Sequence, residues 1–146
     1  MNILLVEDDP IHIKLVERAL KKSGFNNQLI VARDGEEVFN YLFNQNMDQR
    51  SELMSEEFVY PHLILMDINL PKINGLEILR RIKQSPQLQH IPVVILTTSS
   101  NRADLEKCYE YHANSYVIKP LDYEEFNQKI RSIEHYWLMV NEILYR

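Results

Sequence analysis

The sequence predicts an α/β fold, a three-layer sandwich in which a five-stranded parallel sheet lies between two layers of helices. Five short apolar runs alternate with amphipathic segments along the chain, which is the pattern of repeated strand and helix units. Several runs are continuously apolar, as expected of strands that are buried on both faces. Right-handed crossovers leave only a few strand orders, and 2-1-3-4-5 is one of them.

Strands are expected where apolar residues cluster between turn residues. The clearest run is LILM at residues 63–66, which Asp67 ends. Such a run fits the centre of a parallel sheet. The five expected strands cover residues 2–6, 28–32, 62–66, 91–96 and 114–118.

Apolar residues at helical spacing predict a helix after each strand. Asp9, Asp34 and Asp122 stand where N-caps are needed, Pro10 suits a first helical position, and Ser23-Gly24 suits a helix end. The helix at 102–111 has few large aliphatic residues and is expected to pack loosely. The expected helices cover residues 10–22, 37–43, 76–84, 102–111 and 122–145.

Size and composition indicate one soluble domain over residues 1–146. The chain is 45% apolar and 25% charged, as in ordinary globular proteins. Residues 1–133 are expected to form the core and residues 134–146 a helical extension that mediates oligomerisation. The polar segment 44–60 has no clear period and is expected to be a solvated loop over the sheet edge.

Charge and cysteine content exclude several functions. The net charge of −5 disfavours binding to nucleic acid or to anionic membranes. The single Cys108 excludes an internal disulfide and a cysteine-cluster metal site. With no leader and no long apolar run, a cytoplasmic location is expected. The five histidines show no i, i+4 pair, so surface or boundary positions are favoured over a metal cage.

Chemically active side chains follow four of the five strands. Because parallel strands end at one edge, Glu7, Asp8 and Asp67 are expected to meet there. Their mutual repulsion requires a cation, and Mg²⁺ prefers such carboxylate oxygens. The main-chain carbonyl of Asn69 lies two residues beyond Asp67 and within reach of the same ion.

The same edge carries groups suited to phosphoryl chemistry. Asp67 could act as a nucleophile toward phosphorus, while Lys119 and the Thr97 hydroxyl could contact the phosphoryl oxygens. Taken singly, each residue also fits a structural role: Asp67 could open a turn, the acids at 7–9 could favour a helix N-terminus, and Lys119 could lie on the surface. Their joint placement at strand ends favours the functional interpretation.

These motifs resemble the receiver domain of two-component response regulators, which has the flavodoxin-like, CheY-like fold. The resemblance covers residues 2–133 and includes Pro71, Gly75 and the run YVIKP at 116–120. It implies a phosphoacceptor at Asp67, a direct metal ligand at Asp8, a ligand through water at Glu7, and a carbonyl ligand at Asn69. The implied ion is Mg²⁺ or Mn²⁺.

The resemblance also implies which residues change conformation on phosphorylation and which contact the phosphoryl group. Thr97 would be the switch hydroxyl, Tyr116 the switch aromatic and Lys119 the cation that contacts the phosphoryl group. A cis bond is implied between Lys119 and Pro120. Thr98 departs from the family, which often has a smaller residue there, and could slow access to the acyl phosphate.

The last predicted helix points to an interface. Its apolar residues recur in a heptad pattern, and a helix reaching Tyr145 would extend beyond the sheet. This extension indicates a homodimer through the last helix, with the Tyr116 face as a further candidate; folding back over the domain is the alternative. This extension, the inserted segment 44–60 and the aromatic pair Tyr136-Trp137 resemble small stand-alone regulators that serve cyanobacterial phytochrome histidine kinases.

The predicted function is a phosphorylation switch rather than an enzyme, because it would catalyse at most its own phosphorylation and dephosphorylation. The expected partner is a sensor histidine kinase, and the narrower resemblance implies a phytochrome. One alternative is a Mg²⁺-dependent phosphatase of the haloacid dehalogenase class, although Asn69 stands where that class has a second acid. A flavin binder is disfavoured because Glu7-Asp8-Asp9 would repel phosphate, and a receiver that acts only by docking is a further alternative.

Overall fold

The computed structural model describes residues 1–43 and 60–144 of the chain. It contains one five-stranded sheet with the order β2-β1-β3-β4-β5, and all four strand pairs are parallel. The predicted α/β fold and the order 2-1-3-4-5 are therefore confirmed. The strands are β1 (Asn2–Val6), β2 (Gln28–Ala32), β3 (Leu63–Met66), β4 (Val93–Thr97) and β5 (Ser115–Ile118).

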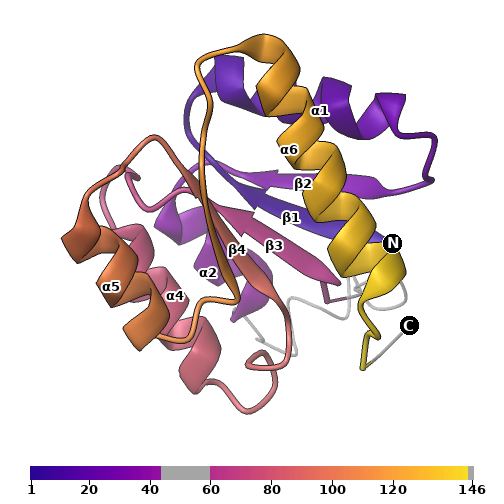
Figure 1. Ribbon diagram of the computed structural model, residues 1–146. Helices are drawn as coiled ribbons and strands as arrows, with labels where there is room; N and C mark the ends of the chain where they lie inside the picture. The colour runs from indigo at the N-terminus through magenta and orange to yellow at the C-terminus, as the bar shows by residue number, and fades with distance from the viewer. Residues whose placement is uncertain (44–59, 145–146) are drawn as a thin grey trace.

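Helices cover both faces of the sheet. Helices α1 and α6 pack on one face, and α2, α4 and α5 lie on the other (Figure 1). This arrangement is the predicted three-layer sandwich. The helices are α1 (Pro10–Lys22), α2 (Gly35–Leu42), α4 (Gly75–Gln84), α5 (Arg102–Glu110), α6 (Tyr123–Glu134) and the π-helix η1 (His135–Val140).

Alternation along the strands builds two cores. In β1, Leu4 and Val6 enter the core under α2, α4 and α5, whereas Ile3 and Leu5 enter the core under α1 and α6. Successive strand side chains point to opposite faces, so a fully apolar strand serves both layers. Helix α5 buries only Cys108, which agrees with its predicted loose packing.

The predicted caps are present. The carboxylates of Asp9, Asp34 and Asp122 accept hydrogen bonds from backbone N–H groups in the first turns of α1, α2 and α6. Pro10 is the first residue of α1. These bonds satisfy amide groups that have no partner inside the helix, and they place the helix starts at the carboxyl edge of the sheet.

The chain end differs from the predicted helix over residues 122–145. The α-helix ends at Glu134, η1 follows to Val140, and residues 141–144 are not helical. A π-turn contains more residues than an α-turn and so rotates the following side chains. Leu138 is therefore buried at 1% exposure, while Val140 of the predicted heptad stripe is 56% exposed.

The C-terminal segment packs against its own domain. Leu138 belongs to the core under α1 and α6, and Trp137 and Ile143 pack against that core. For these three residues, the structure agrees with the alternative that the chain end folds back over its own domain. The prediction of one continuous helix with a heptad stripe is wrong. The regular α-helix ends at Glu134, and the π-helix that follows turns Leu138 into the core. Tyr145 lies outside the described residues.

Replacing Leu138 by alanine is expected to lower the free energy of unfolding by about 2–5 kcal/mol, because the change removes a buried side chain and leaves a cavity. Leu121→Ala is the matched control, since Leu121 is exposed and its truncation is expected to change stability by less than about 0.5 kcal/mol. Urea unfolding measures both values. Equal effects of the two substitutions would contradict the observed packing.

The bond before Pro120 differs from its predicted isomer. No peptide bond among the described residues is cis, so the expected cis bond between Lys119 and Pro120 is wrong; trans is the favoured isomer even before proline.

The expected solvated loop at residues 44–60 lies outside the described residues except for Tyr60. Within 1–43 and 60–144, no helix has the length and apolar character needed to cross a bilayer.

Candidate functional site

Two neighbouring strands place the central carboxylates. Val6 of β1 and Met66 of β3 are paired in the sheet, so Glu7 and Asp67 leave it at the same level. The Asp67 N–H donates to the Val6 carbonyl at 3.0 Å, and the Glu7 N–H donates to the Ala32 carbonyl at 3.0 Å. Both side chains are buried, with 3% and 7% exposure. The predicted meeting of acids at this edge is therefore observed for Glu7 and Asp67.

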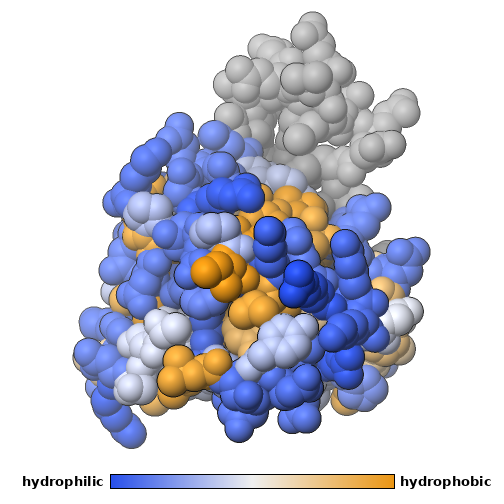
Figure 2. Space-filling view, turned by 90° about the horizontal axis from the view of Figure 1, so that it is seen from above, coloured by the Kyte–Doolittle hydropathy of each residue, from blue (hydrophilic) through white to orange (hydrophobic). Residues whose placement is uncertain are grey.

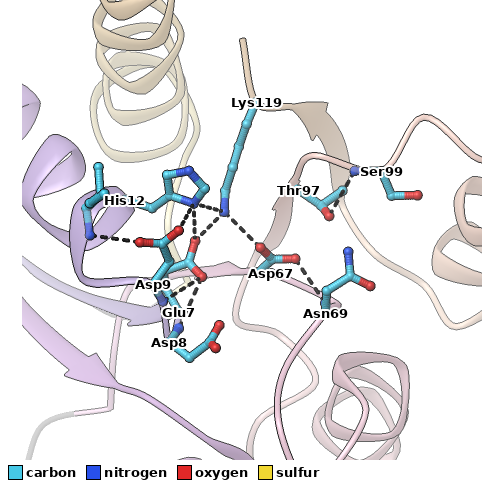
Figure 3. A network of polar contacts seen from close by, with 10 residues as sticks. Glu7, Asp8, Asp9, His12, Asp67, Asn69, Thr97, Ser99 and Lys119 are labelled. Carbon is cyan, nitrogen blue, oxygen red and sulfur yellow. Dashed lines mark hydrogen bonds and ion pairs between the residues drawn. The ribbon is translucent and has the colours of Figure 1, made fainter. Parts of the chain in front are cut away.

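Lys119 joins the two carboxylates. It follows β5, and its Nζ donates to Oδ2 of Asp67 at 2.8 Å and to Oε1 of Glu7 (Figure 3). The lysine side chain is 2% exposed. A buried charge is tolerated only when it is paired and hydrogen-bonded, and here one ammonium pairs with two carboxylates. The site therefore stabilises a positive charge between Glu7 and Asp67.

Backbone amides orient the carboxylates. Oδ1 of Asp67 accepts a hydrogen bond from the Asn69 N–H at 3.0 Å, so each oxygen of Asp67 has a partner. Oε2 of Glu7 accepts from the N–H groups of Asp8 and Asp9 at 3.1 and 3.4 Å. The Asp8 side chain is exposed beside Glu7 (Figure 3). The Asp67 carboxylate is thus held in one orientation by hydrogen bonds to both of its oxygens.

The two predicted switch residues are linked through a neighbouring loop. Oγ1 of the buried Thr97 accepts a hydrogen bond from the Ser99 N–H at 3.3 Å. The Tyr116 hydroxyl donates to the Ser99 carbonyl at 2.9 Å, and burial raises the pKa of Tyr116 above its usual value. Sequence reasoning missed Ser99. Its place two residues after the strand-end threonine was the available signal.

His12 is a second residue that sequence reasoning missed. Its Nδ1 lies 2.9 Å from Nζ of Lys119 and 3.3 Å from Oε1 of Glu7. His12 lies at the boundary of the protein with 27% exposure, in agreement with the prediction of surface or boundary histidines, but its contact with Lys119 was not predicted. The available signal was its place in the first turn of α1, three residues after the capping Asp9, where a side chain can face the same edge of the sheet.

The donor set fits a hard divalent cation. Glu7, Asp8 and Asp67 offer carboxylates, Asn69 offers a backbone carbonyl, and such oxygen ligands suit Mg²⁺ and Mn²⁺. The buried Lys119 ammonium, bound to two of these carboxylates, shows that the site favours positive charge. Among the described residues, no three side chains of histidine, cysteine or acid form a metal cage by themselves. A cation here would therefore need backbone oxygen or water as further ligands.

The fold and the site define a class of protein. A doubly wound parallel sheet carries an acidic cluster with a buried lysine at its carboxyl edge, which suits cation and phosphoryl chemistry. The family model described as the response regulator receiver domain matches residues 3–131. The chain therefore belongs to the receiver domain family of response regulators.

Individual relatives span nearly the whole chain. The response regulator Rcp1 of Synechocystis sp. (strain ATCC 27184 / PCC 6803 / Kazusa) is 41% identical over 136 residues, which are 93% of this chain and 88% of Rcp1. The probable methanogenesis regulatory protein FilR2 of Methanothrix harundinacea (strain 6Ac) is also 41% identical, over 93% of this chain and 83% of FilR2.

Solved structures of response regulators have the same fold as this chain. The phosphorylated cyanobacterial phytochrome response regulator RcpA has a TM-score of 0.86 and 36% identity, covering 98% of this chain and 97% of RcpA. The Mn²⁺-bound form of Rcp1 has a TM-score of 0.85 and 39% identity, covering 97% of both chains.

The comparisons establish the general function. The chain is a receiver-domain response regulator of two-component signalling, similar to Rcp1, and such domains are signalling switches rather than catalytic enzymes. Divalent metal binding belongs to this class, and a Mn²⁺-bound structure is among its neighbours. The alternative of a haloacid dehalogenase phosphatase has no support.

Proposed function

We propose that Asp67 accepts a phosphoryl group from the phosphohistidine of a sensor kinase, and that this modification switches the partner surface of the protein. The observation that carries the proposal is the buried contact of Lys119 with both Asp67 and Glu7. This arrangement supports the proposal because it places a nucleophilic carboxylate beside the cation that its phosphorylated form needs.

The transfer requires few protein groups. A carboxylate oxygen of Asp67 forms the new P–O bond, while the P–N bond of the donor breaks and its electron pair returns to the imidazole ring. Lys119 offsets the charge on the phosphoryl oxygens. Asp8, Asp67 and the Asn69 carbonyl would hold Mg²⁺, with Glu7 bound through water, and the ion would supply further positive charge at the phosphoryl group.

The switch would act through Thr97 and Tyr116. The Thr97 hydroxyl would turn toward the phosphoryl group, and this turn would end its bond with the Ser99 N–H. Because Tyr116 donates to the carbonyl of the same serine, a change at Ser99 reaches the surface beside α5 and α6. A changed hydrogen bond between Tyr116 and Ser99 would alter which partner protein binds at this surface.

Labelling tests the proposal directly. The chain is incubated with acetyl phosphate or a phosphorylated histidine kinase, with Mg²⁺ present, and the product is mapped by mass spectrometry. One alkali-labile phosphoryl group on Asp67 is expected, and a chelator is expected to prevent its formation. A chain that stays unlabelled with both donors would act as a docking module only, and the proposal would fail.

A phytochrome histidine kinase is the partner that we propose. The support is the similarity to RcpA, which is described as a phytochrome response regulator, and we expect the two proteins to meet in the cytoplasm. Phosphoryl transfer from a phytochrome kinase is expected to outpace transfer from an unrelated histidine kinase. Equal rates from both kinases would contradict this assignment.

We further propose a homodimer that uses the apolar side chains left exposed near the chain end, with the Tyr116 face as a second candidate surface. These side chains are half exposed or more, and they are Tyr136, Met139, Val140 and Leu144. Exposed apolar groups of this kind gather at interfaces.

The double substitution of Met139 and Val140 by glutamate is expected to convert the dimer to a monomer in sedimentation velocity, because it places charges in the contact. Leu121→Gln is the control, since Leu121 is an exposed apolar residue outside this group. A dimer that persists in the double variant would exclude the chain end and leave the Tyr116 face.

A further inference from the structure

All three donors of the Lys119 ammonium have a partner. Two are the carboxylates of Glu7 and Asp67, and the third is Nδ1 of His12 at 2.9 Å. An ammonium only donates hydrogen bonds. Nδ1 of His12 must therefore accept at this distance, and the ring proton lies on Nε2.

The ring of His12 is held from several sides. It stands in the first turn of α1 and stacks on Phe126 of α6, with ring centroids 6.4 Å apart and planes inclined by 26°. The carboxylates that face its Nδ1 are more distant than Lys119, at 3.3 Å for Glu7 and 3.6 Å for Asp9. The shortest polar contact of the ring is therefore the one with Lys119 (Figure 3).

The three acceptors differ in charge. Glu7 and Asp67 are carboxylates that a divalent cation would also use, so their hold on Lys119 weakens when such a cation shares them. The imidazole acceptor is neutral and forms no part of the proposed metal ligands. Its bond with Lys119 can therefore persist when the carboxylates are engaged.

We propose that His12 is a positioning residue, whose Nδ1 accepts the third hydrogen bond of Lys119 and keeps the ammonium beside Asp67, in reach of a phosphoryl group. The benefit to phosphorylation rests on the function proposed for Asp67, whereas the contact itself does not. The role is one of orientation, because His12 acts through Lys119.

Two substitutions distinguish the effect of the hydrogen-bond acceptor of His12 from the effect of its aromatic ring. His12→Phe keeps an aromatic ring for Phe126 and removes the acceptor, while His12→Asn removes the ring and places an amide oxygen near the position of Nδ1. Both variants are expected to fold, because His12 is partly exposed on the first turn of α1. Circular dichroism checks this expectation.

The first readout is the ammonium of Lys119 itself. Nitrogen-edited NMR at low temperature detects a lysine ammonium when hydrogen bonds protect it from exchange, and Lys119→Met assigns the signal. The signal is expected in the wild type, absent in His12→Phe and retained in His12→Asn.

Lys83 provides an internal reference for these spectra. Its Nζ donates to the carbonyls of Gln89 and Ile91 and to Oδ1 of Asn114, away from the site. Burial lowers the pKa of Lys83 to about 8, so spectra recorded near pH 7 keep it mostly charged. Its signal is expected to be the same in all variants.

The second readout is phosphorylation by acetyl phosphate. His12→Phe is expected to lower the maximal rate roughly tenfold, the effect of one hydrogen bond to a charged group, with an unchanged Mg²⁺ concentration at half-maximal rate. His12→Asn is expected to restore most of the rate. This rescue distinguishes an acceptor from mere packing, which the asparagine cannot supply.

Two results would overturn the inference. One is a His12→Phe variant that keeps the ammonium signal and the wild-type rate, and the other is a His12→Asn variant that loses both. If the wild type takes no phosphoryl group, the function proposed for Asp67 fails, and the ammonium spectra alone decide whether His12 holds Lys119.

Discussion

Replacing Asp67 by asparagine is expected to abolish phosphoryl labelling, with a loss of at least roughly a thousandfold in rate. An amide has nearly the size of the carboxylate but is a far weaker nucleophile toward phosphorus. The side-chain oxygen of asparagine can still accept from the Asn69 N–H, so the loop keeps one of its contacts. The measurement is the amount of acyl phosphate formed with acetyl phosphate and Mg²⁺.

Asp34→Asn is the matched control for this experiment. Asp34 caps α2 at the end of β2, and asparagine is an equally good cap, so full labelling is expected. Labelling that survives in the Asp67 variant would place the phosphoryl group on another residue. Glu7, which shares the Lys119 ammonium with Asp67, and the exposed Asp8 would then be the carboxylates to examine first.

Gly75→Ala is expected to lower the free energy of unfolding by about 2–4 kcal/mol, because the added methyl group would overlap backbone atoms. A Cβ at Gly75 would lie 2.5 Å from the Cα of Ile68 and 2.7 Å from the carbonyl oxygen of Asp67. Backbone atoms cannot rotate away, so either α4 or the loop that follows β3 must shift. Urea unfolding measures the loss.

The same substitution is expected to slow phosphorylation, because the displaced loop carries Asp67. Gly24→Ala is the control: its Cβ would meet open space, but its φ of +78° lies in the left-handed region, and the cost is expected to be about 1 kcal/mol. The close packing of α4 on this loop would be contradicted by equal losses at the two glycines.

Figure 2 shows the hydropathy of one face of the molecule. The face it shows is largely hydrophilic, and hydrophobic residues gather in a small group near its centre. A surface of this kind suits a switch with a limited apolar contact area. Exposed apolar side chains of the described residues are spread over several elements, and the most exposed are Leu121, Leu144 and Ile11.

Much of the site was predictable because strand ends in a parallel sheet share one edge. Once β1, β3, β4 and β5 were placed, the acids, Thr97 and Lys119 had to lie near one another. The partners of each group were not predictable. Ser99 and His12 join the network through their exact distances to neighbouring groups, which depend on how each loop and the first turn of α1 close over the sheet.

The sequence by itself determined the alternation of strands and helices, their caps and the chemistry at each strand end, since these depend on residues close together in the chain. Only the tertiary structure decided that Lys119 reaches Asp67 and Glu7, which are 52 and 112 positions away, and that His12 completes its contacts. It also decided that a π-turn ends the last helix and buries Leu138. Local periodicity says nothing about distances between remote residues, and packing sets those distances.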